Sequence, residues 1–150
     1  MKPLENLLVA ATQSNRKIVL SEGADPRVIE AAISARKQGI AQIVLVGNVA
    51  QITDLLAKAG GQDLDGIEIH DPSDTPLGDE LAQAFYAARK HKGVTIEDAE
   101  TAILNPSVFA ALLVRTGTEE GTIGGAITAT AEIVRTAIQI IGPAKGAKIV

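Results

Sequence analysis

Apolar and polar residues follow two spacings that alternate along the chain. Short apolar runs predict buried strands over 17–20, 42–46 and 67–69. Apolar residues that recur every three or four positions predict helices over 3–13, 26–38, 49–59, 77–91, 95–104, 106–115 and 129–141. A strand or tight loop is expected at 122–126, and 148–150 begin another strand.

Residues at the ends of these segments support the predicted boundaries. Asp25 is suited to an N-cap and Pro26 to the first helical position, so a helix begins there and stops at Gly39. Thr95 with Asp98 three residues later forms a capping-box pattern. Strand-then-helix order with short connections predicts an α/β domain with a mostly parallel sheet.

Several helices carry an apolar face that we expect to be buried. In the first two helices this face comprises Leu4, Leu7, Leu8 and Ala11, and then Val28, Ile29, Ala32 and Ala35. In helix 77–91 it comprises Leu81, Ala84, Phe85 and Ala88. In the last helix a wide stripe is expected to be buried, comprising Ile133, Val134, Ala137, Ile138 and Ile141.

Composition narrows the classes of function. Aromatic residues make up 2% of the chain and the formal net charge is −4, which argues against nucleic acid or an anionic membrane surface as a partner. The absence of cysteine excludes disulfides and a cysteine-linked acyl intermediate within these residues and fits a cytoplasmic location. The apolar stretch 7–11 is shorter than a signal peptide, and no run reaches the length of a membrane span.

The segment 121–130 is the first place where the residues suggest chemistry. Gly124 and Gly125 let an anion approach the backbone, Thr128 and Thr130 offer hydroxyls, and the following helix offers free N–H groups. Together these features can hold phosphate, although the pattern is neither a Walker A loop nor G-x-G-x-x-G. On spacing alone we favour the simpler interpretation, a strand-to-helix turn that needs glycine for tight packing.

Arg135 stands in a narrow polar stripe on the last helix, together with Thr128, Glu132 and Gln139. Its spacing from Glu132 allows an ion pair. If the stripe faces a cleft, the planar guanidinium can bind phosphate oxygens with two hydrogen bonds. If the stripe faces bulk water, which is the more common case, Arg135 is an ordinary surface charge.

Arg89 begins a basic run, 89–92, at the end of a predicted helix. Cations there complement the negative end of the helix dipole, which explains the run as a whole. Arg89 also lies on the same side of the helix as Phe85, next to the inward stripe. Its long side chain could therefore reach a neighbouring cleft.

Metal sites and serine triads find little support in the sequence. His70 and His91 lack a metal-binding spacing, so no metal site is expected, and no G-x-S-x-G motif is present. His70 lies between a strand and a turn, where a hydrogen-bonded loop histidine is expected. Glu22 lies near the carboxyl end of a strand, where open α/β sheets bind ligands, and is kept as a supporting candidate.

Three blocks, in order and at matching spacing, resemble the phosphate acetyltransferase family. They are the segment 17–28 (KIVLSEGADPRV), the RKHKG segment 89–93, and Gly125-Ala126 followed by Arg135 and the segment 139–142. The resemblance covers essentially all 150 residues. It implies a three-layer α/β/α sandwich similar to the isocitrate/isopropylmalate dehydrogenase architecture. It also implies the transfer of an acetyl group between coenzyme A and inorganic phosphate.

The resemblance assigns roles to the candidates already found. Arg135 would contact the phosphate or acyl phosphate, and Arg89 coenzyme A or the shared anionic cleft, both as catalytic residues. Gly124, Gly125, Thr128 and Thr130 would bind substrate. No cofactor is implied beyond acetyl-CoA and phosphate as substrates, and the complete enzyme would be a homodimer. The sequence departs from the family where a serine is usual at Gly124 and a histidine-containing run at 128–130, so no histidine role transfers and acyl-chain preference stays open.

Family proteins are about twice as long and place their active site between two domains. Residues 1–150 would then be the N-terminal part of the first domain, without the second domain and the returning C-terminal segment. We therefore expect an incomplete sheet with an exposed edge, and no turnover by these residues alone. Two related alternatives remain: a non-catalytic acetyl-CoA-sensing regulatory module, and a phosphate butyryltransferase-like enzyme.

Overall fold

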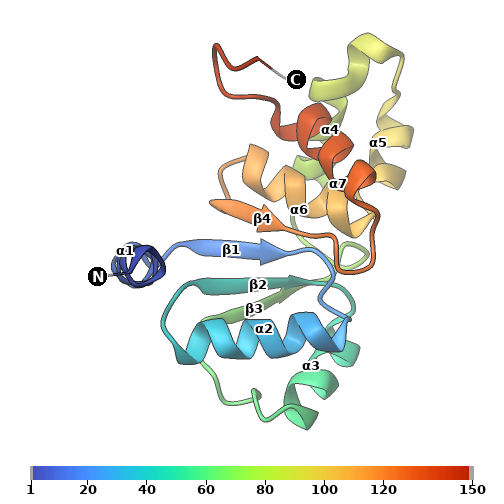
Figure 1. Ribbon diagram of the computed structural model, residues 1–150. Helices are drawn as coiled ribbons and strands as arrows, with labels where there is room; N and C mark the ends of the chain where they lie inside the picture. Colours follow the sequence, from blue (N-terminus) through green and yellow to red (C-terminus); the bar gives the residue numbers. More distant parts are fainter. Residues whose placement is uncertain (1, 149–150) are drawn as a thin grey trace.

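A computed structural model describes residues 2–148, which form three layers with one parallel sheet in the middle (Figure 1). The sheet has the order β3-β2-β1-β4, and each neighbouring pair is parallel. Its strands are β1 (Lys17–Leu20), β2 (Gln42–Val46), β3 (Ile67–His70) and β4 (Gly121–Ile123). The predicted α/β fold with a mostly parallel sheet is therefore confirmed.

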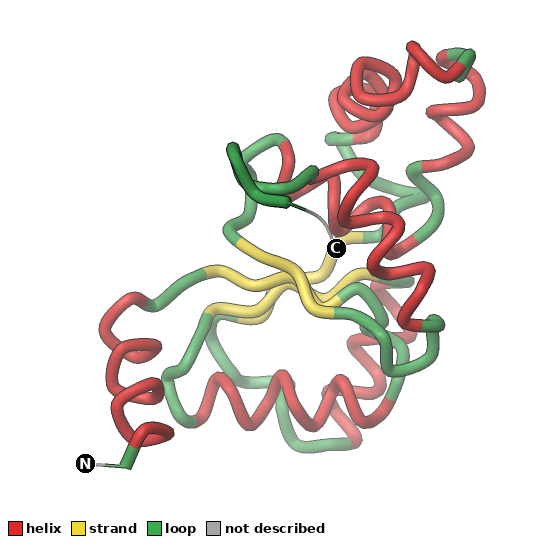
Figure 2. Tube along the Cα trace, turned by 45° about the horizontal axis from the view of Figure 1, so that its top comes forward, coloured by secondary structure: helices red, strands yellow, loops and turns green. Residues whose placement is uncertain are grey.

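Helices cover both faces of this sheet (Figure 2). One face carries α2 (Pro26–Lys37) and α3 (Val49–Lys58). The other carries α4 (Gly78–Arg89), the 3-10 turn η1 (Lys90–Lys92), α5 (Ile96–Ala102), α6 (Pro106–Arg115), α7 (Thr130–Thr136) and the π-helical turn η2 (Ala137–Ile141). The predicted helices are thus present, with α4 ending earlier than expected and the last helix split into α7 and η2.

Alternation along the strands divides the core between the two helical layers. Val19, Val44 and Val46 face the layer of α4, α5 and α6, whereas Ile43 and Leu45 face α2 and α3. All five residues are at most 3% exposed. The core is almost wholly aliphatic, as the composition requires.

The predicted caps form as expected. The Asp25 carboxylate accepts a hydrogen bond from the Arg27 N–H at 2.8 Å and so caps α2. At α5 the Thr95 hydroxyl accepts from the Asp98 N–H at 3.1 Å, and the Asp98 carboxylate accepts from the Thr95 N–H at 2.9 Å. This reciprocal pair is the predicted capping box.

The first helix, α1 (Pro3–Ser14), does not bury the apolar face expected of it. Leu4 and Leu7 are each 67% exposed, and Leu8 is exposed as well. In Figure 1 α1 extends to one side of the sheet, beyond the start of β1. The expectation was wrong because periodicity defines an apolar face but not a partner, and nothing within residues 2–148 covers this one.

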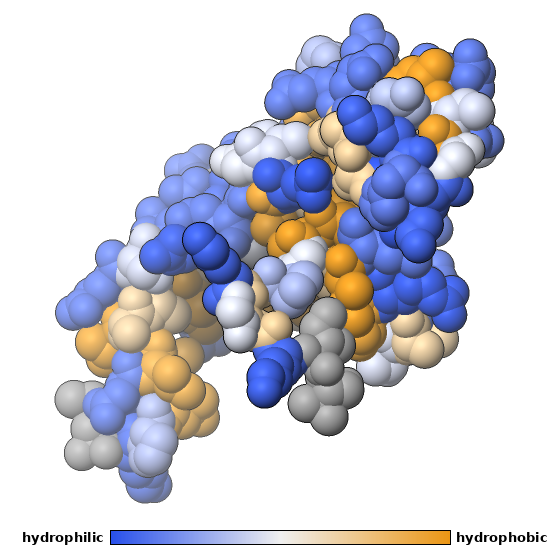
Figure 3. Space-filling view, turned by 90° about the horizontal axis from the view of Figure 1, so that it is seen from above, coloured by the Kyte–Doolittle hydropathy of each residue, from blue (hydrophilic) through white to orange (hydrophobic). Residues whose placement is uncertain are grey.

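The wide buried stripe predicted for the last helix is also wrong in part. Ile133 and Ala137 are half-buried, but Val134, Ile138 and Ile141 are exposed. The side that packs inward ends in the fully buried Ile140, which the prediction omitted. The neighbouring helices, α6 and α4, cover one side of α7 and η2, so three of the five stripe residues face outward. Figure 3 looks onto the molecule from this side, where apolar residues gather between hydrophilic ones.

One edge of the sheet stays open in the described part of the chain. There, β4 pairs with β1 alone, and Ile123 is 64% exposed. The strand expected to begin at 148–150 falls largely on residues 149–150, which lie outside the described residues. Between residues 2 and 148, no helix is long and apolar enough to cross a lipid bilayer.

Candidate functional site

A cavity of about 320 Å³ lies at the carboxyl ends of the strands. It is lined by residues that follow β1 and β2, by the start of α6, and by two residues ahead of α7. These residues include Ser21, Glu22, Asn48, Asn105, Ser107, Ile127 and Thr128. In a parallel sheet all strands end on this side, which is where open α/β folds bind their ligands.

The turn after β4, the glycine loop (Gly124–Thr128), wraps around the carboxylate of Glu22. Gly125 and Ala126 donate their backbone N–H groups to Glu22 Oε2 at 3.0 and 2.7 Å. Ile127 and Thr128 donate theirs to Glu22 Oε1 at 2.9 and 2.7 Å. The glycine loop, whose backbone the sequence suggested an anion could approach, therefore holds an internal carboxylate in this structure.

These contacts set the charge state of Glu22. Burial works to raise its pKa, but the backbone N–H groups of Thr128, Ile127 and Ala126, together with the Thr128 side chain, outweigh burial and leave the pKa below its ordinary value. A carboxyl with a lowered folded-state pKa stabilises the fold above its unfolded pKa. That stability is lost as the pH falls through the lower folded value.

Both glycines of the loop have a structural reason to be glycine. Gly125 has φ +105°, which side chains rarely adopt. A Cβ at Gly124 would lie 2.6 Å from Ser21 Oγ and 2.9 Å from Ile133 Cδ1. The interpretation as a tightly packed strand-to-helix turn therefore describes their local geometry.

Arg27 binds the same loop through one of the loop's backbone carbonyl groups. Its Nη2 donates to the Ala126 carbonyl at 2.8 Å, while Nε and Nη2 donate to the two carboxylate oxygens of Asp25 at 3.0 and 2.7 Å. These hydrogen bonds from the Arg27 side chain lower the pKa of Asp25 to about 2. The sequence marked Asp25 only as a helix cap and gave no sign of this second role.

Arg135 lies on the outer face of α7, beside a hollow of about 570 Å³. The α7 hollow is lined by Thr130, Ala131, Val134, Arg135, Ile138 and Gln139. None of the ion pairs among the described residues joins Arg135 to Glu132. Arg135 is exposed, at the rim of a mostly apolar depression.

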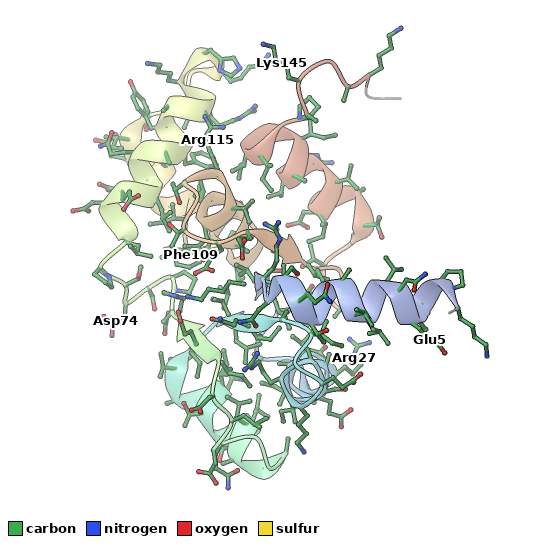
Figure 4. All side chains as sticks on the ribbon, turned by 90° about the vertical axis from the view of Figure 1, so that its left-hand side faces the viewer. Glu5, Arg27, Asp74, Phe109, Arg115 and Lys145 are labelled. Carbon is green, nitrogen blue, oxygen red and sulfur yellow. The ribbon has the colours of Figure 1, made fainter. Side chains whose placement is uncertain are left out.

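The structure brings the predicted site residues together in two groups. Thr130 and Arg135 share the α7 hollow, whereas Gly124, Gly125 and Thr128 surround Glu22. Arg89 lines neither cavity; it is half-buried at the end of α4, which packs against η2, the continuation of α7. Arg115 donates from Nη1 to the Ile140 carbonyl of η2 at 2.7 Å and closes that turn (Figure 4).

Sequence reasoning missed Ser21 as well as Arg27. Ser21 is 2% exposed, and its hydroxyl has no hydrogen-bond partner among the described residues. It directly follows β1, as Gly124 directly follows β4. The parallel pairing of these strands, which places the two residues side by side, is the signal that could have connected them.

A second charged cluster lies on the sheet face that carries α4 and α6. Lys17 Nζ is 2.7 Å from Glu68 Oε1 and 3.6 Å from Glu119 Oε1, and His70 Nε2 is 3.8 Å from Glu68 Oε2. His70 belongs to β3 and lies near the Phe109 ring, so the expectation of a loop histidine was wrong. Glu68, His70 and Glu119 could each offer a ligand atom to a metal ion, but the Lys17 ammonium already supplies a cation there.

Glu119 in this cluster provides a test of stability against pH. Burial raises the pKa of its carboxyl despite the opposing charge of Lys17, and Glu119 Oε2 has no hydrogen-bond partner among the described residues. A raised folded-state pKa means that ionisation costs stability as the pH rises through it. We expect Glu119→Gln to raise Tm by about 2–4 °C at pH 8, the shift that about 1 kcal/mol produces in a domain of this size, and to leave it unchanged near pH 4.

Thermal unfolding followed by circular dichroism at both pH values checks this expectation. Glu120→Gln is the matched control, because Glu120 is exposed and pairs with Arg16 on the surface at 2.9 Å. It should change Tm little at either pH. A lower Tm for Glu119→Gln at pH 8 would mean that attraction to Lys17 outweighs the cost of burial.

Comparison with known proteins connects this geometry to one family. The family described as phosphate acetyl/butaryl transferase matches residues 3–150. The phosphate acetyltransferases of Thermoanaerobacterium thermosaccharolyticum and Paracoccus denitrificans are each 41% identical to this chain over 150 residues, which is all of it. The chain spans about half the length of these relatives, namely 45% of the first and 43% of the second.

Solved structures give the same result for the fold. A phosphotransacetylase from Streptococcus pyogenes has a TM-score of 0.86 and 34% identity, over 93% of this chain and 43% of that chain. The EutD phosphotransacetylase from Staphylococcus aureus has a TM-score of 0.86 and 31% identity, over 99% of this chain and 46% of that chain. With a family match over residues 3–150 and a fold shared along nearly its whole length, the chain belongs to the phosphate acetyl/butaryl transferase family.

Proposed function

We propose that this chain is part of an acyltransferase that moves an acetyl group between coenzyme A and inorganic phosphate. The observation that carries the proposal is the 41% identity to phosphate acetyltransferases over all 150 residues. An exposed arginine at the rim of the α7 hollow supports it, because phosphate and the phosphate groups of coenzyme A are both anionic.

In the proposed reaction a phosphate oxygen attacks the thioester carbon of acetyl-CoA. A carbon–oxygen bond forms and the carbon–sulfur bond breaks; the attacking hydrogen phosphate loses its proton, and coenzyme A leaves as the thiol with one proton gained by its sulfur. The products are acetyl phosphate and coenzyme A. Negative charge develops on the carbonyl oxygen along the way, so fixed donors in a partly dry cleft accelerate the step.

Arg135 is assigned to phosphate and Arg89 to coenzyme A. A guanidinium offers two parallel N–H groups to phosphate oxygens, and Arg135 has no carboxylate partner among the described residues to compete for it. Arg89 would reach the same cleft from α4, which packs against η2. Both residues would hold the substrates in line, which saves the entropy of bringing them together.

The glycine loop has a different part in this proposal. Gly124 and Gly125 let the loop approach the substrate closely, while the Thr128 and Thr130 hydroxyls are the candidate donors to it. The backbone N–H groups of 125–128 already donate to Glu22, so the hydroxyls and Arg135 are better placed to meet the anion. No histidine or metal is given a role.

The proposal for the complete protein rests on the relatives, since this chain spans about half of their length. Residues 1–150 would form the N-terminal part of a first domain, with a second domain and a returning segment completing the cleft. The open edge at β4 is where a further strand could pair. As in the family it resembles, the complete enzyme is proposed to act in the cytoplasm as a homodimer.

Arg89 gives a specific test of the coenzyme A assignment. In the complete gene product, Arg89→Ala should raise KM for acetyl-CoA by about 10-fold or more, because hydrogen bonds to a charged group contribute about 1.5–3 kcal/mol. The KM for phosphate should change much less. Lys92→Ala, three residues beyond the end of α4, is the control.

Acetyl phosphate formation from acetyl-CoA and phosphate is the assay, with butyryl-CoA run in parallel. Preference for the butyryl substrate would assign the chain to the butyryltransferase branch. Binding of coenzyme A without turnover of either substrate would favour a regulatory module. An equal rise of both KM values in Arg89→Ala would contradict the assignment of Arg89 to coenzyme A.

A further inference from the structure

Glu22 is held by more hydrogen bonds than a helix cap or a surface carboxylate requires. Its two oxygens accept from four consecutive backbone N–H groups, those of Gly125, Ala126, Ile127 and Thr128, at 2.7–3.0 Å. A carboxylate has about four acceptor positions, and here each is filled. The acceptor and its donors lie more than 100 residues apart in sequence, so tertiary structure alone joins them.

Consecutive N–H groups converge on one point only when the backbone turns sharply between them. Gly125, with φ +105°, provides that turn. Gly124 fixes the start of the turn, because its missing side chain leaves room for Ser21 on one side and Ile133 of α7 on the other. The loop is thus shaped around Glu22 and packed against both β1 and α7.

The segment that contains Glu22 also binds the glycine loop through a backbone carbonyl of the loop. Arg27 donates to the Ala126 carbonyl while Asp25 holds its guanidinium by two hydrogen bonds. Residues 22–27, which run from the end of β1 into the first turn of α2, therefore fix both the donors and one acceptor of the glycine loop. Figure 4 shows Arg27 beside α2, which is seen end-on in this view.

The last N–H group held by Glu22 is that of Thr128, two residues before α7 begins at Thr130. Thr130 and Arg135 then line one hollow on α7. The hydrogen bonds to Glu22 therefore hold the backbone two residues before the point from which α7 starts. We propose that Glu22 is a positioning residue, whose carboxylate latches the glycine loop and so places the Thr130–Arg135 face of α7 for the anionic substrate.

The competing idea is that these N–H groups bind phosphate directly. Phosphate would then have to displace a carboxylate that is tethered to the fold and acts at a high effective concentration. The displaced Glu22 would also remain close to the bound phosphate and repel it. The latch therefore leaves the anion to Arg135 and the threonine hydroxyls, an assignment that rests on the proposed function.

The latch can be measured without any enzymatic assay, in the complete gene product. The amide proton shifts of residues 125–128, followed by NMR as the pH is lowered, should move together with one apparent pKa below the ordinary value of a glutamate. Glu22→Gln should abolish this shared titration, because the amide keeps one acceptor oxygen and cannot ionise. Glu30→Gln, the same change at an exposed position of α2, should leave it intact.

Kinetics then test the positioning role. Glu22→Gln should keep the wild-type circular dichroism spectrum. It should lower kcat/KM for phosphate by about 10- to 100-fold, the loss expected when a residue that contacts the substrate is slightly displaced. The KM for acetyl-CoA should change far less, and Glu22→Asp should recover part of the loss. A general loss of folding would instead lower the active fraction and leave both KM values unchanged.

The outcomes separate the latch from the proposed function. Amide shifts of 125–128 that titrate independently of residue 22, or wild-type kinetics in Glu22→Gln, would overturn the positioning role. A wild-type protein that makes no acyl phosphate would overturn the proposed function instead. In that case the shared titration would still decide whether Glu22 holds the loop.

Discussion

Replacing Arg135 by alanine is expected to lower kcat/KM for phosphate by about 100- to 1,000-fold, the loss that follows removal of one fixed donor from a developing anion. The fold should stay intact, because Arg135 is exposed and makes no ion pair among the described residues. Acetyl phosphate formation by the complete gene product, with circular dichroism as a check on folding, measures both effects.

Arg135→Lys distinguishes charge from geometry. Lysine keeps the positive charge but cannot offer two parallel N–H groups, so we expect it to recover only part of the lost activity. Arg16→Ala is the matched control, since Arg16 is an exposed arginine whose partner is Glu120 on the surface. Full activity in Arg135→Ala would remove Arg135 from the site, and full recovery in Arg135→Lys would mean that charge alone suffices.

The sequence predicted the strands and helices well because their signals are local. The apolar runs at 17–20 and 42–46 match β1 and β2 at both ends, and Asp25 caps α2 as its residue type predicts. What the sequence could not supply is the identity of packing partners. The apolar face of α1 finds no partner in the described residues, and three of the five residues of the stripe on α7 and η2 are exposed for the same reason.

The candidate site shows the same limit at the level of single residues. Gly124, Gly125 and Arg135 could be selected from residue type and spacing, but the acceptor of the loop N–H groups could not. Glu22 meets that loop only because β1 and β4 are parallel neighbours whose ends coincide. A carboxylate after one strand and a glycine pair after another become a single feature once the strand order is known.

The core offers the largest expected loss of stability, at Phe109. Its ring is fully buried between α6 and the sheet, within the cluster that includes Val19, Val44 and Leu112, and lies near His70 at 6.4 Å between ring centroids (Figure 4). Phe109→Ala should lower the free energy of unfolding by about 3–5 kcal/mol, the cost of deleting a buried ring and leaving a cavity. Urea unfolding followed by circular dichroism measures the loss.

Phe85→Ala is the matched control, and the contrast tests the assigned core. The chain has two phenylalanines, and Phe85 packs only partly buried at the margin of the same cluster. The sequence pattern predicts that Phe85 faces the core, whereas the structure buries Phe109 more deeply. Because a partly buried ring removes less apolar surface from water than a fully buried one, Phe85→Ala should cost clearly less than Phe109→Ala. Equal losses, or a greater loss at Phe85, would show that the centre of this core lies nearer α4 than α6.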